Sequence, residues 1–122
     1  MTDVSKFNNQ SLGEEISNAI SHGLGAAISI AGTVLMIVYA CLNHKSAITI
    51  TSVSIYGATL IILYLTSCIY HALACNKGKK VFQILDHCMI FVLIVGTYTP
   101  ICLGIIGGAL GWVIMGINLA CM

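Results

Sequence analysis

Charged side chains are scarce in this sequence of 122 residues: they make up 7% of it, and none of them is an arginine. Apolar residues make up 58%, and the mean hydropathy is +0.99. A soluble domain carries about 25% charged residues, and a small fold cannot bury this much apolar surface. A net charge of +1 without arginine also argues against a surface for nucleic acid. We therefore expect an integral membrane protein whose partners are membrane lipids, with no nucleic acid among them.

The sequence also lacks the pattern of a disulfide framework, although it contains six cysteines. No two of them form a C-x-x-C pair, and most lie within apolar runs. A free thiol in such a run behaves as a small hydrophobic group. The cysteines therefore predict packed or lipid-facing thiols and give no sign of an oxidising compartment.

Long stretches without Asp, Glu, Lys or Arg indicate the membrane spans. A spanning helix needs about 20 apolar residues. This criterion predicts helices at Ile20–Leu42, Ile48–Leu73 and Ile84–Leu103, with a fourth from Gly107 to Met122. The predicted fold class is an all-α membrane protein with four transmembrane helices in a single domain.

The first 19 residues are polar, and lysine placement predicts the side of the membrane on which they lie. Ser11 and Glu14 fit the S-x-x-E capping box, so a short interfacial helix should begin there. Residues 75–80 hold three of the five lysines, the N-terminal segment holds Lys6, and the first loop holds Lys45. By the positive-inside rule, the N-terminus and the second loop should be cytoplasmic, and the protein should lie in the cell membrane.

The fourth predicted span is short. Its 16 residues would reach about 24 Å, whereas the hydrocarbon core is about 30 Å thick. The span also ends without an interfacial Lys, Trp or Tyr anchor. We therefore expect that the 122 residues are a truncated form of a longer protein.

Ionisable residues at membrane depth are candidates for function. His71 lies six residues before Lys77, and Asp86 lies six residues after Lys80. Each group would then sit about 9 Å from the lysine loop, on neighbouring antiparallel helices. Ser67 is one turn deeper on the face that carries His71. We therefore expect Ser67, His71 and Asp86 to form a polar cluster inside the bundle.

Such a cluster suits zinc chemistry or proton relay, or it simply ties two helices together by hydrogen bonds. Imidazole is a common zinc ligand, and a carboxylate can orient the metal-bound water that attacks a lipid ester or amide. One histidine and one aspartate do not complete a catalytic zinc site, which usually has three protein ligands. His22 is expected to be an interfacial imidazole at the start of the first span, and His87 to point away from the partner of Asp86.

The third span contains Pro100, which cannot donate a hydrogen bond to the Gly96 carbonyl, so a kink is expected there. Thr97 or Thr99 could bond the backbone groups that this kink frees. The glycines between Gly104 and Gly108 fit either a close-packing motif or the turn into the fourth span.

Three blocks of the sequence resemble the hemolysin III family. The segment EEISNAISHGLG (Glu14–Gly25) is similar to its N-terminal signature, and SCIYH (Ser67–His71) matches its S-x-x-x-H motif. LDHCMIF (Leu85–Phe91), followed by GTYTP (Gly96–Pro100), matches its third-helix block. The blocks occur in the family's order and spacing, and the resemblance covers nearly the whole chain.

The resemblance implies a seven-helix membrane protein, related to the progestin and adipoQ receptors and to alkaline ceramidases, with a cytoplasmic N-terminus. It also implies a zinc site in which His71 is a metal ligand, Asp86 orients water, and Ser67 is a nearby polar partner. The two further ligands would belong to an H-x-x-x-H motif in the last helix. This motif does not occur in the sequence. The resemblance therefore implies a lipid hydrolase in the complete protein and an inactive, incomplete site in these 122 residues.

Two other functions remain open from the sequence. The family name implies cytolysis, although the chain lacks the amphipathic segment with which a self-inserting protein would hide its spans. The length and helix count also fit a small four-helix transporter. Such exporters use a glutamate within the first helix, whereas Glu14 and Glu15 precede the first apolar run.

Overall fold

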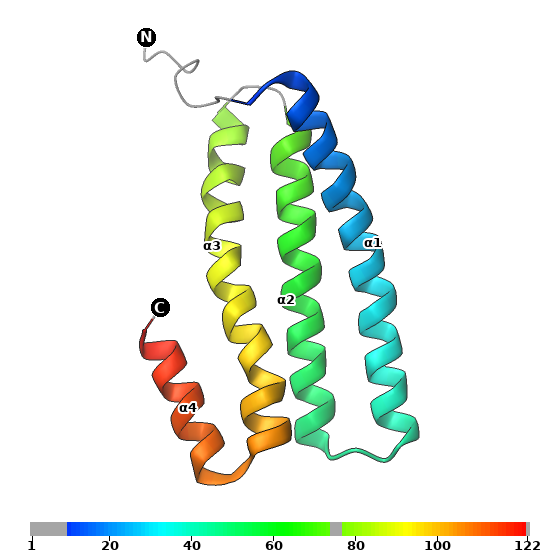
Figure 1. Ribbon diagram of the computed structural model, residues 1–122, viewed down its shortest axis with the longest axis vertical. Coiled ribbons are helices and arrows are strands. Elements are labelled where there is room, and N and C mark those ends of the chain that lie inside the picture. Colours follow the sequence, from blue (N-terminus) through cyan, green and yellow to red (C-terminus); the bar gives the residue numbers. More distant parts are fainter. Residues whose placement is uncertain (1–9, 74–76, 122) are drawn as a thin grey trace.

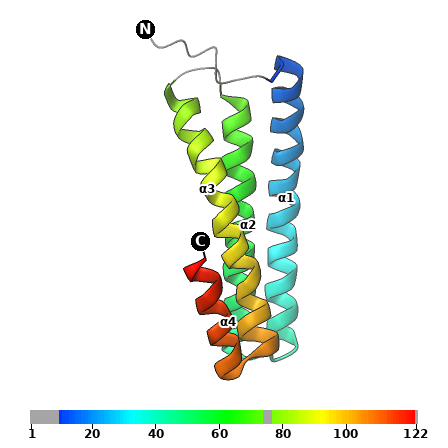
Figure 2. The same cartoon turned by 60° about the vertical axis from the view of Figure 1, so that its left-hand side comes forward.

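The computed structural model describes residues 10–73 and 77–121, and every regular element within these ranges is helical. The elements are α1 (Leu12–Leu42), α2 (Ala47–Ala72), α3 (Lys77–Thr99), a π-helix η2 (Pro100–Ile106) and α4 (Gly108–Ala120). Successive long helices run antiparallel, and α2 lies between α1 and α3 (Figures 1 and 2). The all-α fold predicted from the sequence is confirmed.

Three helical segments are long and apolar enough to cross a membrane: Leu12–Leu42, Ala47–Ala72 and Gly78–Ile106. They correspond to the three full spans expected from the charge-free stretches, although the second helix ends one residue earlier than predicted, at Ala72. The fourth helix, Gly108–Ala120, is equally apolar but has only 13 residues within the described ranges. The lysine count that predicts the orientation rests partly on Lys6, which lies outside those ranges.

Helix α1 begins eight residues before the expected span and continues without a break for 31 residues. Its start is fixed by the predicted capping box: the Ser11 hydroxyl accepts the Glu14 backbone N–H, and the Glu14 carboxylate accepts the Ser11 N–H at 2.6 Å. The interfacial helix and the first span are therefore one helix, about 46 Å long. This length exceeds a hydrocarbon core of about 30 Å, so one end of α1 extends to headgroup depth.

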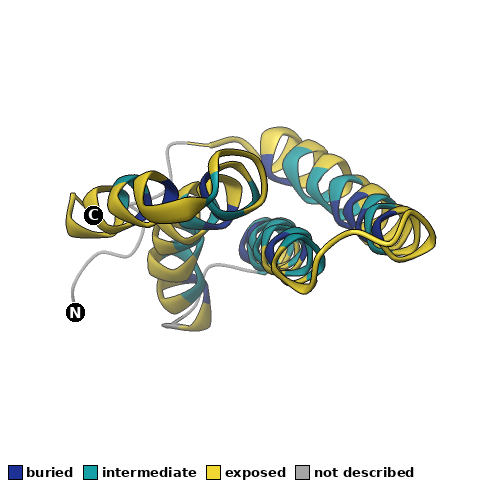
Figure 3. Ribbon diagram, turned by 90° about the horizontal axis from the view of Figure 1, so that it is seen from below, coloured by how far each residue is buried: buried dark blue, intermediate teal, exposed yellow. Residues whose placement is uncertain are grey.

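Most of the buried positions in α1 and α2 are small or polar residues, whereas many large apolar residues are exposed. The ribbon coloured by burial shows buried and exposed positions alternating along both helices (Figure 3). The most buried positions of the two helices are Glu15, Ala26, Ser29, Thr33 and Ala40 in α1 and Ser52, Gly57, Ser67 and Tyr70 in α2. At Gly57 the backbone approaches Thr33 so closely that a β-carbon would collide with its side chain. This is the usual arrangement of membrane helices, in which small residues permit close contact and apolar residues face lipid.

The change from α3 to η2 falls at Pro100, where the sequence predicts a kink. The α-helix ends at Thr99, and the chain continues as a π-helix to Ile106. The Thr97 and Thr99 hydroxyls donate to the carbonyls of Leu93 and Val95, not to that of Gly96. The turn into α4 lies at Gly107 and Gly108, both with positive φ, which glycine adopts without strain.

Candidate functional site

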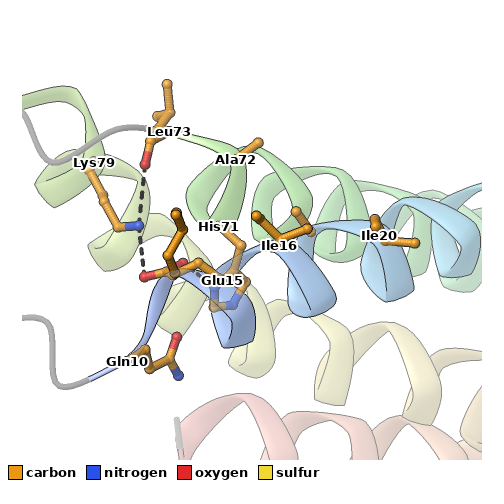
Figure 4. A pocket seen from close by; sticks show the side chains of 10 residues that line it. Gln10, Glu15, Ile16, Ile20, His71, Ala72, Leu73 and Lys79 are labelled. Carbon is orange, nitrogen blue, oxygen red and sulfur yellow. Dashed lines mark hydrogen bonds and ion pairs between the residues drawn. The ribbon is translucent and has the colours of Figure 1, made fainter.

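Helix α1 begins at the end of the bundle where α2 ends and α3 begins (Figure 1). Polar side chains from the three helices are in contact there. Glu15 lies at their centre and is only 6% exposed. Its Oε2 atom is 2.8 Å from Nδ1 of His71, and its Oε1 atom is 2.8 Å from Nζ of Lys79. One carboxylate therefore joins side chains from all three long helices (Figure 4).

Lys79 is buried beside this carboxylate, although the sequence places it in a polar loop. Its Nζ also donates to the Leu73 carbonyl at 3.3 Å and lies 5.1 Å from the centre of the Tyr70 ring. An ammonium group loses hydration when it is buried, and these contacts replace it. Lys79 thus serves as a partner of Glu15 as well as a positive charge at this end of the bundle.

A second polar contact continues the cluster toward the middle of the bundle. His22 Nδ1 is 2.5 Å from the Ser67 hydroxyl oxygen, and Ser67 is 3% exposed. The His22 and His71 rings meet edge to face, with their centroids 5.5 Å apart. The polar contacts therefore extend from the ends of the helices into the apolar region. In order, they involve Lys79, Glu15, His71, His22 and Ser67.

The structure places the expected residues Ser67 and His71 in this cluster, but they are not directly bonded to each other. Ser67 contacts His22, and His71 contacts Glu15. Asp86 is half-buried in α3. Among the described residues, no hydrogen bond or ion pair joins Asp86 to His71 or Ser67.

Sequence reasoning missed Glu15 and His22 as members of the site. The sequence places Glu15 in the polar N-terminal segment and predicts that His22 is an interfacial imidazole at the start of the first span. The signal that could have found them is their spacing of seven residues, which places both on one face of a helix. The same face carries Ser29, so the pattern indicates the side of α1 that meets α2.

An open pocket of about 660 Å³ lies beside the cluster, at the start of α1 and the end of α2 (Figure 4). Leu12, Ile16 and Ile20 form much of its apolar lining, and Glu15, His71 and Lys79 supply polar atoms. The pocket therefore combines an apolar wall with a hydrogen-bonded acid and base at one end of the membrane-spanning helices. Such a combination can accept the boundary region of a lipid, between its headgroup and its acyl chains.

The residues of this site fit part of a zinc centre. Within the described ranges, no group of three His, Cys, Asp or Glu side chains could hold a metal ion. His71 nevertheless has the environment of a zinc-binding histidine, because a carboxylate engages its Nδ1 atom and Nε2 would be the ligating nitrogen. The described residues thus fit one ligand position and do not complete a site with three protein ligands.

Three apolar helices of spanning length define a multi-pass membrane protein. Residues 10–122 match the family described as Haemolysin-III related. The chain is 44% identical over 102 residues to Hemolysin-3 homolog of Bacillus subtilis (strain 168), covering 84% of this chain and 47% of that protein. It is 40% identical over 117 residues to Hemolysin-3 of Bacillus cereus, covering 96% and 53%.

The chain therefore belongs to the hemolysin III family, as the three sequence blocks indicate. It spans about half the length of these two curated relatives. No solved structure matches the chain.

Proposed function

We propose that this hemolysin III family member is a zinc-dependent hydrolase of membrane lipids in its complete form, and that His71 is one of the zinc ligands. The observation that carries the proposal is the buried contact between Glu15 and His71 at the edge of an apolar pocket. The proposal requires further metal ligands beyond the described residues. The family resemblance implies that they come from an H-x-x-x-H motif.

Three residues of the chain would have distinct roles in the reaction. His71 would bind the metal through Nε2, because Glu15 engages the other ring nitrogen at 2.8 Å. Asp86 would orient the attacking water, and Ser67, whose hydroxyl contacts His22, would be a polar partner of the reacting group. Zinc, when bound, supplies a Lewis acid that makes water nucleophilic near neutral pH.

The pocket supports a lipid as the substrate class. Acyl chains would lie along Leu12, Ile16 and Ile20, which places the adjoining amide or ester near the polar groups. The family's relation to alkaline ceramidases favours a ceramide-like amide. A water-soluble substrate would gain little from an apolar wall that opens at the edge of the membrane.

The test compares the protein made from its complete gene with its His71→Ala variant, both purified in detergent. The wild type should bind zinc and release fatty acid from a ceramide-like lipid, and the variant should lose both properties. Equal zinc content in the two proteins would remove His71 from the metal site. Zinc binding without hydrolysis of ceramide, sphingolipid or glycerolipid substrates would refute the hydrolase.

A cytolytic role is the second candidate, and the names of the two relatives, Hemolysin-3 homolog and Hemolysin-3, favour it. Addition of the purified protein to erythrocytes should then release haemoglobin, and this release should persist in His71→Ala. Lysis that disappears with His71 would indicate that membrane damage results from lipid hydrolysis. Absence of lysis at any protein concentration would contradict the cytolytic candidate.

We also propose that the protein lies in the cell membrane with its N-terminus in the cytoplasm. The start of α1 lies at the same end of the bundle as the end of α2 and the start of α3 (Figure 1). Lys77, Lys79 and Lys80 lie in the first turn of α3 at this end, and Lys45 lies at the other. This distribution supports the orientation through the positive-inside rule.

A further inference from the structure

We infer that Glu15 is a positioning residue for His71: it fixes the tautomer and the orientation of the imidazole so that Nε2 is the nitrogen available to a metal. This inference rests on the proposed function only in what Nε2 would bind. The contact itself, Nδ1 to Oε2 at 2.8 Å, is a property of the chain.

The chemistry of the two groups determines which nitrogen of the His71 ring carries the proton. A carboxylate only accepts hydrogen bonds, so the Nδ1 atom that faces it carries the proton. In a neutral imidazole the other nitrogen then has the free lone pair. Histidines that bind zinc commonly donate their second ring N–H to a carboxylate in this way.

Lys79 holds the carboxylate in place for this role. Its Nζ contacts Oε1 of Glu15 at 2.8 Å, which leaves Oε2 directed at His71 (Figure 4). Lys79 is itself fixed by the Leu73 carbonyl, so the carboxylate is anchored to the end of α2.

Two further features restrict the His71 ring. The edge of His22 meets it at 89°, with the ring centroids 5.5 Å apart, and His22 is in turn held by Ser67. The capping box directly before Glu15 fixes the first turn of α1, so Glu15 faces α2 while Glu14 remains exposed at the cap. Neighbouring glutamates therefore have distinct roles. Glu14→Gln offers a matched control, because glutamine at this position retains the capping box.

The first measurement needs no metal. In protein labelled with nitrogen-15 at histidine and freed of metal by a chelator, His71 should show a protonated Nδ1 and an unprotonated Nε2. His71→Ala assigns the signal. Glu15→Gln should mix the two tautomers, whereas Glu14→Gln should leave the spectrum unchanged. A wild-type His71 signal in folded Glu15→Gln would overturn the inference.

The second measurement is zinc affinity in the protein made from its complete gene. Loss of such a carboxylate typically weakens metal binding about 10- to 100-fold. We expect this loss in Glu15→Gln and no change in Glu14→Gln. Unchanged affinity in Glu15→Gln, with affinity lost in His71→Ala, would overturn the inference and leave the proposed function standing. Unchanged affinity in His71→Ala would overturn the proposed function, while the tautomer measurement would still test Glu15.

Glu15→Asp covers the case in which Glu15→Gln does not fold. It keeps the negative charge opposite Lys79 but withdraws the carboxylate from His71 by one methylene. We expect a mixed tautomer and weaker zinc binding in this variant too. Wild-type values for both quantities would overturn the inference, because they would show that contact with His71 is not what matters.

Discussion

The ion pair between Lys79 and Glu15 gives a quantitative prediction for Lys79→Met. The two side chains are 10% and 8% exposed, and their charged atoms are 2.8 Å apart. Methionine fills the space of the lysine stem but removes the charge that balances the carboxylate. Breaking a buried pair in this way costs about 3–5 kcal/mol. We expect the lower end, about 3 kcal/mol, because His71 still contacts Glu15.

The next residue supplies the control. Lys80 is exposed, and an exposed pair contributes at most about 1 kcal/mol, so Lys80→Met should have a small effect. The difference of about 2 kcal/mol corresponds to a roughly 30-fold change in the unfolding equilibrium. It can be measured in detergent micelles by titration with SDS, followed by far-ultraviolet circular dichroism. Equal losses in the two variants would refute the buried pair.

Two further predictions concern packing and orientation. Gly57→Val should destabilise the α1–α2 contact by about 1–3 kcal/mol in the same titration, because the valine side chain would collide with Thr33. Gly32→Ala is the control and should not destabilise the contact, because a β-carbon at Gly32 meets no other atom. A comparable loss at both glycines would contradict the close approach. In a cysteine-free background, an impermeant maleimide should label Asn43→Cys in intact cells and Gln10→Cys only after lysis. The reverse pattern would refute the cytoplasmic N-terminus.

The sequence predicts the membrane spans well because their signal is local. A spanning helix needs a long apolar run without charge, and this requirement alone locates the three long helices. It does not locate the start of α1, because hydropathy falls off at Ile20 while the backbone remains helical to Leu12. The Ser11–Glu14 capping box carries that information, and it predicts a helix start without saying that the helix continues unbroken.

The site was only partly predictable. Ser67 and His71 stand out because they are polar within an apolar run, and spacing suffices to bring them to one helix face. Their partners depend on how α1 and α3 rotate against α2, which no local pattern specifies. Lys79 is the clearest example, since the same charge indicates a cytoplasmic loop in the sequence and a buried counter-ion in the structure.

The central place of α2 has a consequence for how the protein is made. A chain that enters the membrane from its N-terminus inserts α1 and α2 first, and this hairpin already joins Glu15 to His71. The counter-charge arrives only with α3, which carries Lys79. If synthesis stopped after α2 and before α3, Glu15 would lie at the membrane edge without Lys79 as its counter-ion. Helix α3 therefore supplies the charge that balances Glu15, although His71 lies in α2. The two helices must both be inserted before the site is neutral.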